Sequence, residues 1–296
     1  SGLIFRFITI KERNTMVTLN NFRKHYKDFD LNISMQIPAG TVTGLIGRNG
    51  AGKSTTIKAI LGLINPDEGE VCVFDKNPRE FTPRDKEAIG TVIGGNLLGD
   101  FITAEDTIAI LRKMYADFDE PYFRAQCKAL ELPLEKPFKD LSNGMKARLR
   151  VLIAISHKAR LLVLDEPTAG MDVIARSEIL DLLREYLAQD GERSVLISSH
   201  ISSDIEGFCD DVYLIERGEI VLHEDTDTIL GQYGVLKLSE NEFRDVERQY
   251  IVACKKEAYG YACLTKEKQY FVDNYPGIIV ENGSLDSTII LMLGGR

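Results

Sequence analysis

Apolar and polar positions alternate in the first part of the chain as they do in a half-buried β-strand. Residues 31–37 follow this alternation, and after a turn with proline and glycine an apolar strand is expected at 41–46. A glycine-rich loop comes next, and residues 53–61 have helical spacing up to Gly62, which can end a helix. A further strand is expected at 70–74. This order predicts a strand–loop–helix unit near the start of the main domain.

The middle of the chain, residues 97–157, carries apolar residues three and four positions apart and predicts a helical subdomain. From residue 160 onward, apolar runs typical of buried strands alternate with helical stretches. We expect strands at 161–164 and 194–198, helices at 173–188 and 203–209, and a hairpin at 212–216 and 219–223. Strands that alternate with helices imply a mainly parallel core sheet covered on both faces, so the predicted fold class is α/β.

The same alternation restarts on a smaller scale after residue 233. We expect strands at 235–238, 261–264 and 278–280, and helices at 241–250, 266–274 and 285–293. Residues 16–232 are therefore expected to form the main domain and residues 233–296 a small C-terminal α/β domain. Because the interpretable pattern begins at Met16, residues 1–15 are expected to be a disordered or artificial leader.

The composition is that of an acidic globular protein. Hydrophobic residues make up 44% and charged residues 27% of the 296 residues, and the formal net charge is −9. This charge argues against a nucleic-acid partner, which favours a basic surface. No stretch approaches the ~18 apolar residues of a membrane-spanning helix, so work at a membrane would require a second chain that spans it.

Cysteine spacing bears on the compartment. The five cysteines include no Cys-x-x-Cys pair and have no histidine at metal-binding spacing. We therefore expect the reduced cysteines of a cytoplasmic protein rather than a disulfide or a zinc site.

The most specific motif is the glycine-rich loop. Residues 47–54 read Gly-Arg-Asn-Gly-Ala-Gly-Lys-Ser and satisfy the pattern G-x-x-x-x-G-K-[ST] of a phosphate-binding loop. Its glycines let backbone N–H groups point at phosphate oxygens, and the start of the next helix adds partial positive charge. Lys53 is expected to reach the β- and γ-phosphates and Ser54 to ligate Mg²⁺. The predicted nucleotide contacts in this loop are Gly47, Asn49, Gly50, Ala51, Gly52, Lys53, Ser54 and Thr55.

Two adjacent acids, Asp165 and Glu166, end the apolar strand predicted at 161–164. In a parallel sheet, ligands bind at the carboxyl ends of the strands, so both acids are expected beside the phosphate loop. Asp165 is expected to help hold Mg²⁺, mostly through water. Glu166 would polarise the water that attacks the γ-phosphate.

Between these motifs, residues 141–145 read Leu-Ser-Asn-Gly-Met directly before a predicted helix. They resemble the signature sequence of ATP-binding cassette (ABC) ATPases, which is usually leucine-serine-glycine-glycine-glutamine. Ser142 and Gly144 are kept, whereas the third and fifth positions differ. A serine that caps a helix and a glycine that permits close approach make a second phosphate-binding end.

Three further residues match the family by their order along the chain. Asp172 ends the run Ala-Gly-Met-Asp, which is similar to the D-loop, and His200 stands where the family has its switch histidine. Tyr26 has the spacing of the aromatic residue that stacks on adenine. The resemblance covers about residues 16–232. It assigns catalysis to Glu166, His200 and Lys53. It assigns adenine stacking to Tyr26, contacts to the γ-phosphate of the opposing subunit to Ser142 and Gly144, and a further nucleotide contact to Asp172.

One position departs from the family pattern. The family usually has a metal-contacting glutamine after the strand that ends near Ile93, whereas Gly94 stands here, followed by Gly95 and Asn96. Either Asn96 substitutes for the glutamine or this contact to Mg²⁺ is missing.

The resemblance implies an ABC nucleotide-binding fold of the phosphate-loop NTPase class, with ATP and Mg²⁺ bound between two cassettes. The second cassette would be a copy of this chain or a related one. The runs around Ser142, Asp172 and His200 resemble bacterial exporters of drugs, antibiotics or toxic peptides, which pair with a separate transmembrane permease at the cytoplasmic face of the cell membrane. Two alternatives remain open at this stage: a soluble ABC ATPase of translation or DNA maintenance, and an importer motor.

Overall fold

The computed structural model describes residues 14–94, 99–200 and 203–294 of the 296-residue chain. In this part of the chain the strands are β1 (Thr15–Tyr26), β2 (Phe29–Pro38), β3 (Val42–Ile46), β4 (Glu68–Val73), β5 (Ile89–Val92), β6 (Leu161–Asp165), β7 (Ser194–Ser199), β8 (Asp211–Glu216), β9 (Glu219–Asp225), β10 (Gly234–Leu238), β11 (Ile251–Glu257), β12 (Gly260–Thr265) and β13 (Ile279–Asn282).

The helices of the main domain are α1 (Lys53–Ile60), α2 (Pro83–Glu87), α3 (Ala104–Met114), α4 (Glu120–Ala129), α5 (Asn143–Ile155), α6 (Val173–Ala188), α7 (Ser203–Glu206) and α8 (Thr226–Gln232). Further along the chain follow α9 (Glu240–Asp245), α10 (Lys268–Asn274) and α11 (Leu285–Gly294). Short 3-10 turns occur at Pro78–Glu80, Phe138–Asp140 and Arg248–Tyr250. None of the helices described is long and apolar enough for a membrane crossing.

The main domain is built on a mixed sheet with the strand order β4-β1-β2-β9-β8-β3-β7-β6-β5 in the described residues. Strands β8, β3, β7, β6 and β5 run parallel, whereas β1 pairs antiparallel with β2 and β4. The carboxyl ends of β3, β6 and β7 therefore meet at one edge of the sheet. The glycine-rich loop, Asp165 and His200 stand at or just after these three ends.

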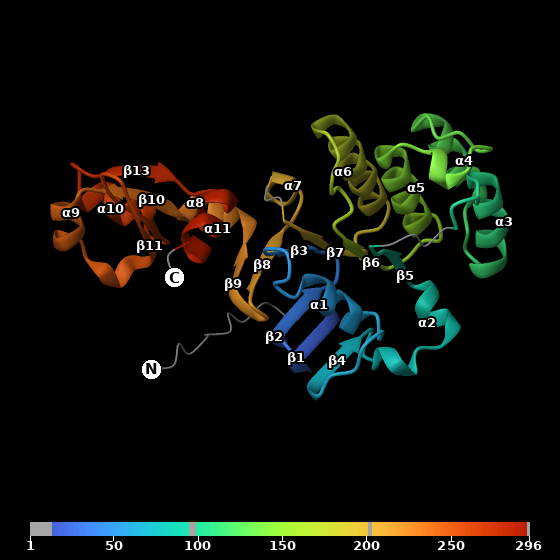
Figure 1. Cartoon of the computed structure of the whole chain (residues 1–296), viewed down its shortest axis with the longest axis horizontal. Helices are drawn as coiled ribbons and strands as arrows, with labels where there is room; N and C mark the ends of the chain where they lie inside the picture. Colours follow the sequence, from blue (N-terminus) through green and yellow to red (C-terminus); the bar gives the residue numbers. More distant parts are fainter. Residues whose placement is uncertain (1–13, 95–98, 201–202, 295–296) are drawn as a thin grey trace.

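Both faces of the parallel strands are buried, as their continuous apolar runs predict. On β6, Leu162 and Leu164 join a core that includes residues of α5 and α6, whereas Leu161 and Val163 join a second core with α1, β1 and β2. Figure 1 shows this arrangement, with α3 and α4 at the end of the molecule far from the C-terminus. The α/β fold class with a mixed core sheet and helices on both faces is confirmed.

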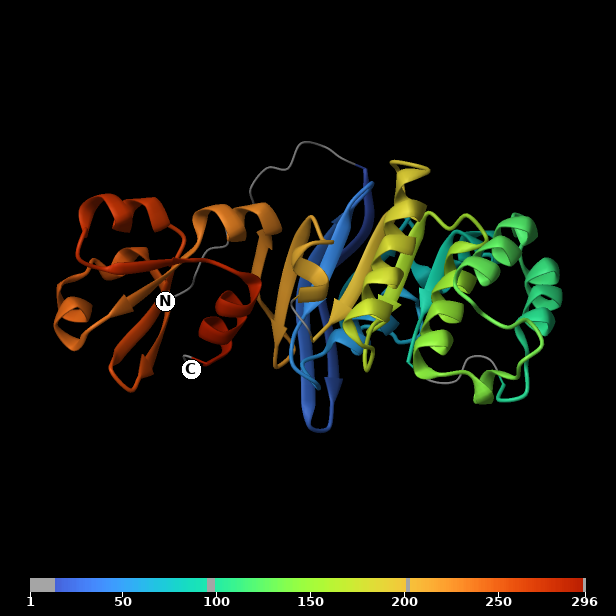
Figure 2. The same cartoon turned by 90° about the horizontal axis from the view of Figure 1, so that it is seen from above.

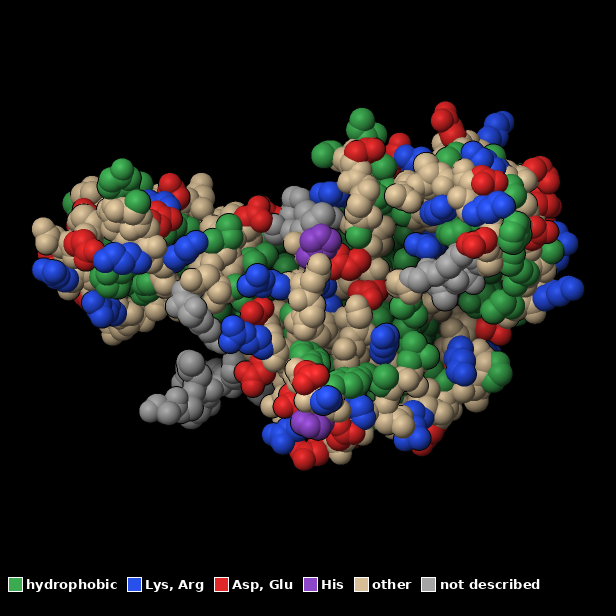
Figure 3. All heavy atoms as spheres, viewed as in Figure 1, with side chains coloured by type: hydrophobic (Ala, Val, Ile, Leu, Met, Phe, Trp, Pro, Cys, Tyr) green, Lys and Arg blue, Asp and Glu red, His purple; other side chains and the backbone are tan. Residues whose placement is uncertain are grey.

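Residues 234–294, called the C-terminal domain below, form a separate lobe in Figures 2 and 3. Its antiparallel sheet has the order β11-β12-β10-β13 in the described residues. One face packs on α9 and α10 through a core that contains Leu236 and Phe271. The other face packs on α11, whose Leu285 and Leu291 share the large core of the main domain. The α11 helix thus ties the C-terminal domain to the cassette.

Three local predictions are wrong. The helix expected at 241–250 ends at Asp245, because Val246 is extended and leads toward a strand that the prediction missed, β11. The helix expected at 203–209 ends at Glu206. Of the predicted leader, residues 1–13 lie outside the described residues. Asn14 and Thr15 belong to the sheet region, since the Asn14 carbonyl accepts a hydrogen bond from the Ala39 N–H at 2.7 Å.

The expectation of five reduced cysteines is also wrong. Cys254 and Cys263 are joined by a disulfide between β11 and β12, while Cys72, Cys127 and Cys209 are free. The two bonded cysteines are directly paired across the antiparallel strands. Their sequence separation alone does not reveal this pairing, because it depends on the register of the hairpin.

Candidate functional site

The loop between β3 and α1 has the backbone of a phosphate cradle. Gly50 and Gly52 have φ angles of +82° and +120°, in the left-handed region that side-chain-bearing residues avoid. A Cβ on Gly47 would lie 2.4 Å from the Ile215 carbonyl oxygen, so only glycine fits there. No side chain caps the start of α1, which leaves its first N–H groups available to an anion.

Lys53 points back along this loop. Its side chain is 6% exposed, and its ammonium donates to the Gly47 carbonyl at 2.7 Å and to the Arg48 carbonyl at 3.4 Å. The same ammonium lies 3.1 Å from Glu166 Oε1. The loop therefore holds a buried positive charge where the phosphates of a nucleotide are expected.

The two acids at the end of β6 face different surroundings. Asp165 is buried, and its Oδ1 accepts a hydrogen bond from Ser198 Oγ at 2.6 Å. Glu166 has a φ of +51°, in the left-handed region that glutamate rarely adopts. Residues with such strained backbone conformations cluster at functional sites. Its N–H donates to Ser198 Oγ at 3.0 Å. Ser198, which the sequence analysis missed, thus contacts both acids from the neighbouring strand β7.

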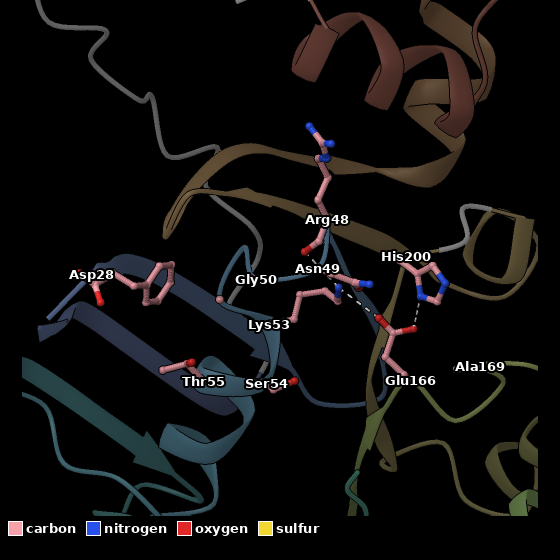
Figure 4. A pocket seen from close by; sticks show the side chains of 12 residues that line it. Asp28, Arg48, Asn49, Gly50, Lys53, Ser54, Thr55, Glu166, Ala169 and His200 are labelled. Carbon is pink, nitrogen blue, oxygen red and sulfur yellow. Dashed lines mark hydrogen bonds and ion pairs between the residues drawn. The ribbon is translucent and has the colours of Figure 1, made fainter. Parts of the chain in front are cut away.

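Glu166 is shared between two groups. Its Oε1 pairs with Lys53, and its Oε2 lies 2.5 Å from His200 Nδ1. Figure 4 shows Glu166 directed toward both residues, whereas the Arg48 side chain points away from them and Asp28 lies at the far side of the loop. The phosphate-loop lysine, the predicted general base and the predicted switch histidine therefore form one connected set.

A cleft of about 720 Å³, called the phosphate-loop cleft below, opens beside these groups. It is lined by eight of the predicted residues: Asn49, Gly50, Gly52, Lys53, Ser54, Thr55, Glu166 and His200. It is also lined by four residues that the sequence analysis did not propose: Asp28, Phe29, Arg48 and Ala169. Arg48 and Ala169 stand inside quoted motifs, at positions to which the sequence analysis gave no role. Asp28 and Phe29, in and after the turn between β1 and β2, reach the cleft only through the fold.

The remaining predicted residues lie outside the cleft lining. Gly47 and Ala51 are buried within the loop, and Asp165 is buried at the end of β6. Ser142 caps α5, since its Oγ accepts from the Met145 N–H at 3.2 Å, and Asp172 caps α6 by accepting from the Ala175 N–H at 2.9 Å. Ser142 and Asp172 are exposed, and Gly144 is partly exposed. The structure therefore leaves these three residues accessible, away from the cleft lining of their own chain.

Tyr26 and Phe29 face each other across the turn between β1 and β2, with ring centroids 6.4 Å apart. Phe29 lines the phosphate-loop cleft, whereas the lining does not include Tyr26, the predicted adenine-stacking residue. A Cβ on Gly52 would be 3.1 Å from Phe29 Cζ, so the Phe29 ring packs directly on the loop. Of these two aromatic side chains, Phe29 is thus the one that lines the cleft.

Replacing Phe29 with alanine is expected to weaken ATP binding at least ~5-fold, because stacking of a base on an aromatic ring contributes about 1–3 kcal/mol. Tyr26→Ala should cost less, since Tyr26 does not line the cleft. Titration calorimetry with ATP measures the affinity of both variants. Phe29→Leu is the control, because it keeps an apolar side chain of similar size but removes the aromatic ring. A larger loss in Tyr26→Ala than in Phe29→Ala would return the stacking role to Tyr26.

The oxygen donors near the loop suit Mg²⁺. Magnesium binds through one or two protein oxygens, with substrate phosphates and water completing its shell. Ser54 offers a hydroxyl that lines the cleft, and Asp165 Oδ2 has no hydrogen bond to a described residue. The described residues contain no group of three or more His, Cys, Asp or Glu side chains that would hold a metal by themselves. This donor set therefore fits a cation that arrives with a nucleotide.

The position that departs from the family pattern is only partly visible. Gly94 is exposed, and a Cβ at this position would meet nothing within 4 Å, so sterics do not require glycine there. Gly95 and Asn96 lie outside the described residues. Whether Asn96 takes the place of the usual glutamine stays a prediction.

Comparison with known proteins identifies the family. Residues 31–169 match the family model for "ABC transporter". Over 215 residues the chain is 33% identical to the lantibiotic transport ATP-binding protein SrtF of Streptococcus pyogenes, an alignment that covers 72% of this chain and 92% of that protein. The chain belongs to the ABC transporter ATP-binding proteins. It is an ATP-binding protein with ATPase activity.

Two further comparisons describe the extent of the likeness to ABC proteins. The linearmycin resistance ATP-binding protein LnrL of Bacillus subtilis (strain 168) is 30% identical over 265 residues, covering 87% of this chain and 85% of that protein. This alignment is longer than the cassette and includes part of the C-terminal domain. A dimeric structure of the ATP-binding cassette MJ0796 in a post-hydrolysis state with ADP and Pi has a TM-score of 0.63 and 24% identity. The match covers 71% of this chain and 99% of the MJ0796 chain, so the two share the same fold over this part.

Proposed function

We infer that this ABC ATPase drives export of a drug, antibiotic or peptide-like cargo through a separate transmembrane permease. The similarity to SrtF and LnrL, whose names refer to lantibiotic transport and linearmycin resistance, supports the direction and the class of cargo. The chain would act at the cytoplasmic face of the cell membrane, held there by the permease. Nothing observed favours a soluble ABC ATPase of translation or DNA maintenance.

The observation that carries the proposed mechanism is the separation of two phosphate-binding ends. The loop end, with Lys53 and Ser54, lines the phosphate-loop cleft, whereas Ser142 and Gly144 stand accessible at the start of α5 and outside it. An accessible helix start with a capping serine suits the γ-phosphate of an ATP molecule held by another subunit. We therefore propose that two cassettes close on ATP, each completing the site of the other.

Binding of ATP would rearrange the pair between Lys53 and Glu166. The phosphates would attract the Lys53 ammonium, because a phosphate carries more negative charge than one carboxylate. Glu166 would then be free to orient the attacking water, with His200 still beside its second oxygen. Mg²⁺ held by Ser54 and Asp165 would supply a Lewis acid for the phosphate oxygens.

Hydrolysis would undo this closure. In the closed pair ATP would be held by both cassettes, so it would stabilise their association by mass action. Loss of the γ-phosphate removes the group that Ser142 and Gly144 contact, and the cassettes can separate. A permease docked on both cassettes would follow this movement and alternate between two states.

The proposal predicts a membrane partner that can be isolated. We expect a tagged copy of this chain, expressed in its native host and extracted gently from membranes, to co-purify with a polytopic membrane protein in stoichiometric amount. An untagged strain is the control. Recovery from the soluble fraction alone, above all with ribosomes or DNA, would contradict export while leaving the ATPase chemistry intact. Recovery of a second, related cassette would identify a heterodimer.

A further inference from the structure

We propose that Cys254 and Cys263 form a reversible thiol–disulfide site that exchanges with low-molecular-weight disulfides and dithiols. The site lies in the hairpin of β11 and β12, within the C-terminal domain and far from the phosphate loop (Figure 1). It does not depend on the ATP site, and only its exposure to cytoplasmic thiols rests on the proposed function.

The hairpin fixes the two cysteines as neighbours whether or not they are bonded. Cys254 pairs directly with Cys263 in the register of the antiparallel strands, and their Cα atoms are 4.2 Å apart. The register is held on both sides of the pair, by Ala253 opposite Leu264 and by Lys255 opposite Ala262. A thiol pair that the backbone holds together has little loop-closure entropy left to lose when it is oxidised.

The two cysteines differ in access, which suits a two-step exchange. Cys254 is partly exposed on the edge strand β11, whereas Cys263 is fully buried on the inner strand β12 beside Leu236 and Phe271. A small disulfide in solution can therefore reach Cys254 first. Cys263 is protected from such a reagent and is placed to resolve the product.

The other three cysteines lack these features. Burial raises the pKa of Cys127 to about 11 and places the pKa of Cys209 well above its ordinary value, so both stay protonated and unreactive. Desolvation, followed by repulsion from the negative charges of Glu70 and Asp75, raises the pKa of the partly exposed Cys72. None of the three is bonded to another cysteine. Reversible bond formation within the chain is therefore specific to the β11–β12 pair.

The chemistry balances with a disulfide RSSR as the oxidant. The Cys254 thiolate attacks one sulfur of RSSR, which forms a mixed disulfide and releases RS⁻. The Cys263 thiol then loses its proton, attacks Cys254 Sγ and releases the second RS⁻. The protein loses two protons and two electrons, and RSSR becomes two RSH. A dithiol reverses both steps.

The proposed location would bring the cysteine pair into contact with the thiols of the cytoplasm. At the cytoplasmic face, thiol systems keep most cysteines reduced, so a disulfide on an accessible edge strand would be in exchange with them. The hairpin packs on α11, and the Leu285 N–H at the start of α11 donates to Glu206 Oε2 at 3.0 Å. The cysteine pair lies on the opposite face of the same sheet, so it is linked to α7, the helix that follows His200 in the chain, through the hairpin backbone and α11.

Thiol counting on the full chain tests the site. The protein is reduced with dithiothreitol, desalted and equilibrated in glutathione buffers that range from fully reduced to fully oxidised. Free thiols are then alkylated under denaturing conditions and counted by intact mass. We expect the count to fall from five to three in one reversible step, with peptide mapping that links Cys254 to Cys263.

Two variants make the test specific. Cys254→Ser should keep all four of its thiols free of intramolecular bonds, and Cys72→Ser should still lose two thiols with the midpoint of the unmodified chain. Five free thiols in every buffer would overturn the proposal. So would a bond that dithiothreitol cannot reduce in the folded protein, or a stable glutathione adduct on a single cysteine.

Discussion

Replacing Glu166 with glutamine is expected to lower the rate of ATP hydrolysis at least ~100-fold while ATP binding is retained. The change removes the carboxylate that lies beside both Lys53 and His200 and keeps its shape. A loss of this size corresponds to about 2.7 kcal/mol, comparable with the removal of one group that stabilises a transition state. Steady-state phosphate release measures the effect.

The control for this experiment is Glu192→Gln. Glu192 is an exposed glutamate in the turn before β7, and its replacement should leave hydrolysis unchanged. Near-normal turnover in Glu166→Gln would remove Glu166 from the role of general base. Loss of ATP binding in the same variant would instead indicate that Glu166 holds the phosphate loop in place.

The second large effect is expected on ATP binding, with a loss of hydrolysis at ATP concentrations near the Kd of the unmodified chain. Lys53→Ala removes the buried ammonium that lies against the Gly47 carbonyl, where the phosphates are expected. Hydrogen bonds to charged groups contribute about 1.5–3 kcal/mol, so the Kd for ATP should rise ~10- to 100-fold. Titration calorimetry measures this change directly.

Lys58→Ala is the matched control, because Lys58 lies in the same helix α1 but is exposed. Thermal unfolding of both variants separates a loss of affinity from a loss of fold. An unchanged Kd in Lys53→Ala would contradict the phosphate cradle derived from the loop geometry.

The local motifs could be read from the sequence because each is encoded over a few residues. The helix predicted at 53–61 is α1 at Lys53–Ile60, and Asp165 ends β6 as expected. Glycines with positive φ and an apolar strand that ends in two acids are short-range signals. The fold class followed from the same alternation of strands and helices.

The parts that the sequence did not reveal depend on contacts between distant elements. Phe29 reaches the phosphate-loop cleft because β2 folds against the loop, and Ser198 contacts Asp165 because β7 lies beside β6. The pairing of Cys254 with Cys263 needs the register of a hairpin whose first strand, β11, was not predicted. Periodicity along one segment carries no information about such neighbours.

The central claim is that ATP is hydrolysed at a site shared by two chains. Gly144→Asp places a negative charge at the start of α5, and the fold accepts it, because a Cβ at Gly144 meets only Ala175 at 3.8 Å and Met171 at 3.9 Å. This variant and Lys53→Ala should each be nearly inactive alone. In a mixture, the intact loop of one chain can meet the intact Ser142 and Gly144 of the other.

The decisive measurement is therefore ATP hydrolysis by an equimolar mixture of Gly144→Asp and Lys53→Ala, beside each variant alone and the unmodified chain. Our account predicts that the mixture recovers a substantial fraction of the activity of the unmodified chain. If the unmodified chain is active and the mixture stays as inactive as its components, the site is not shared and the account is wrong.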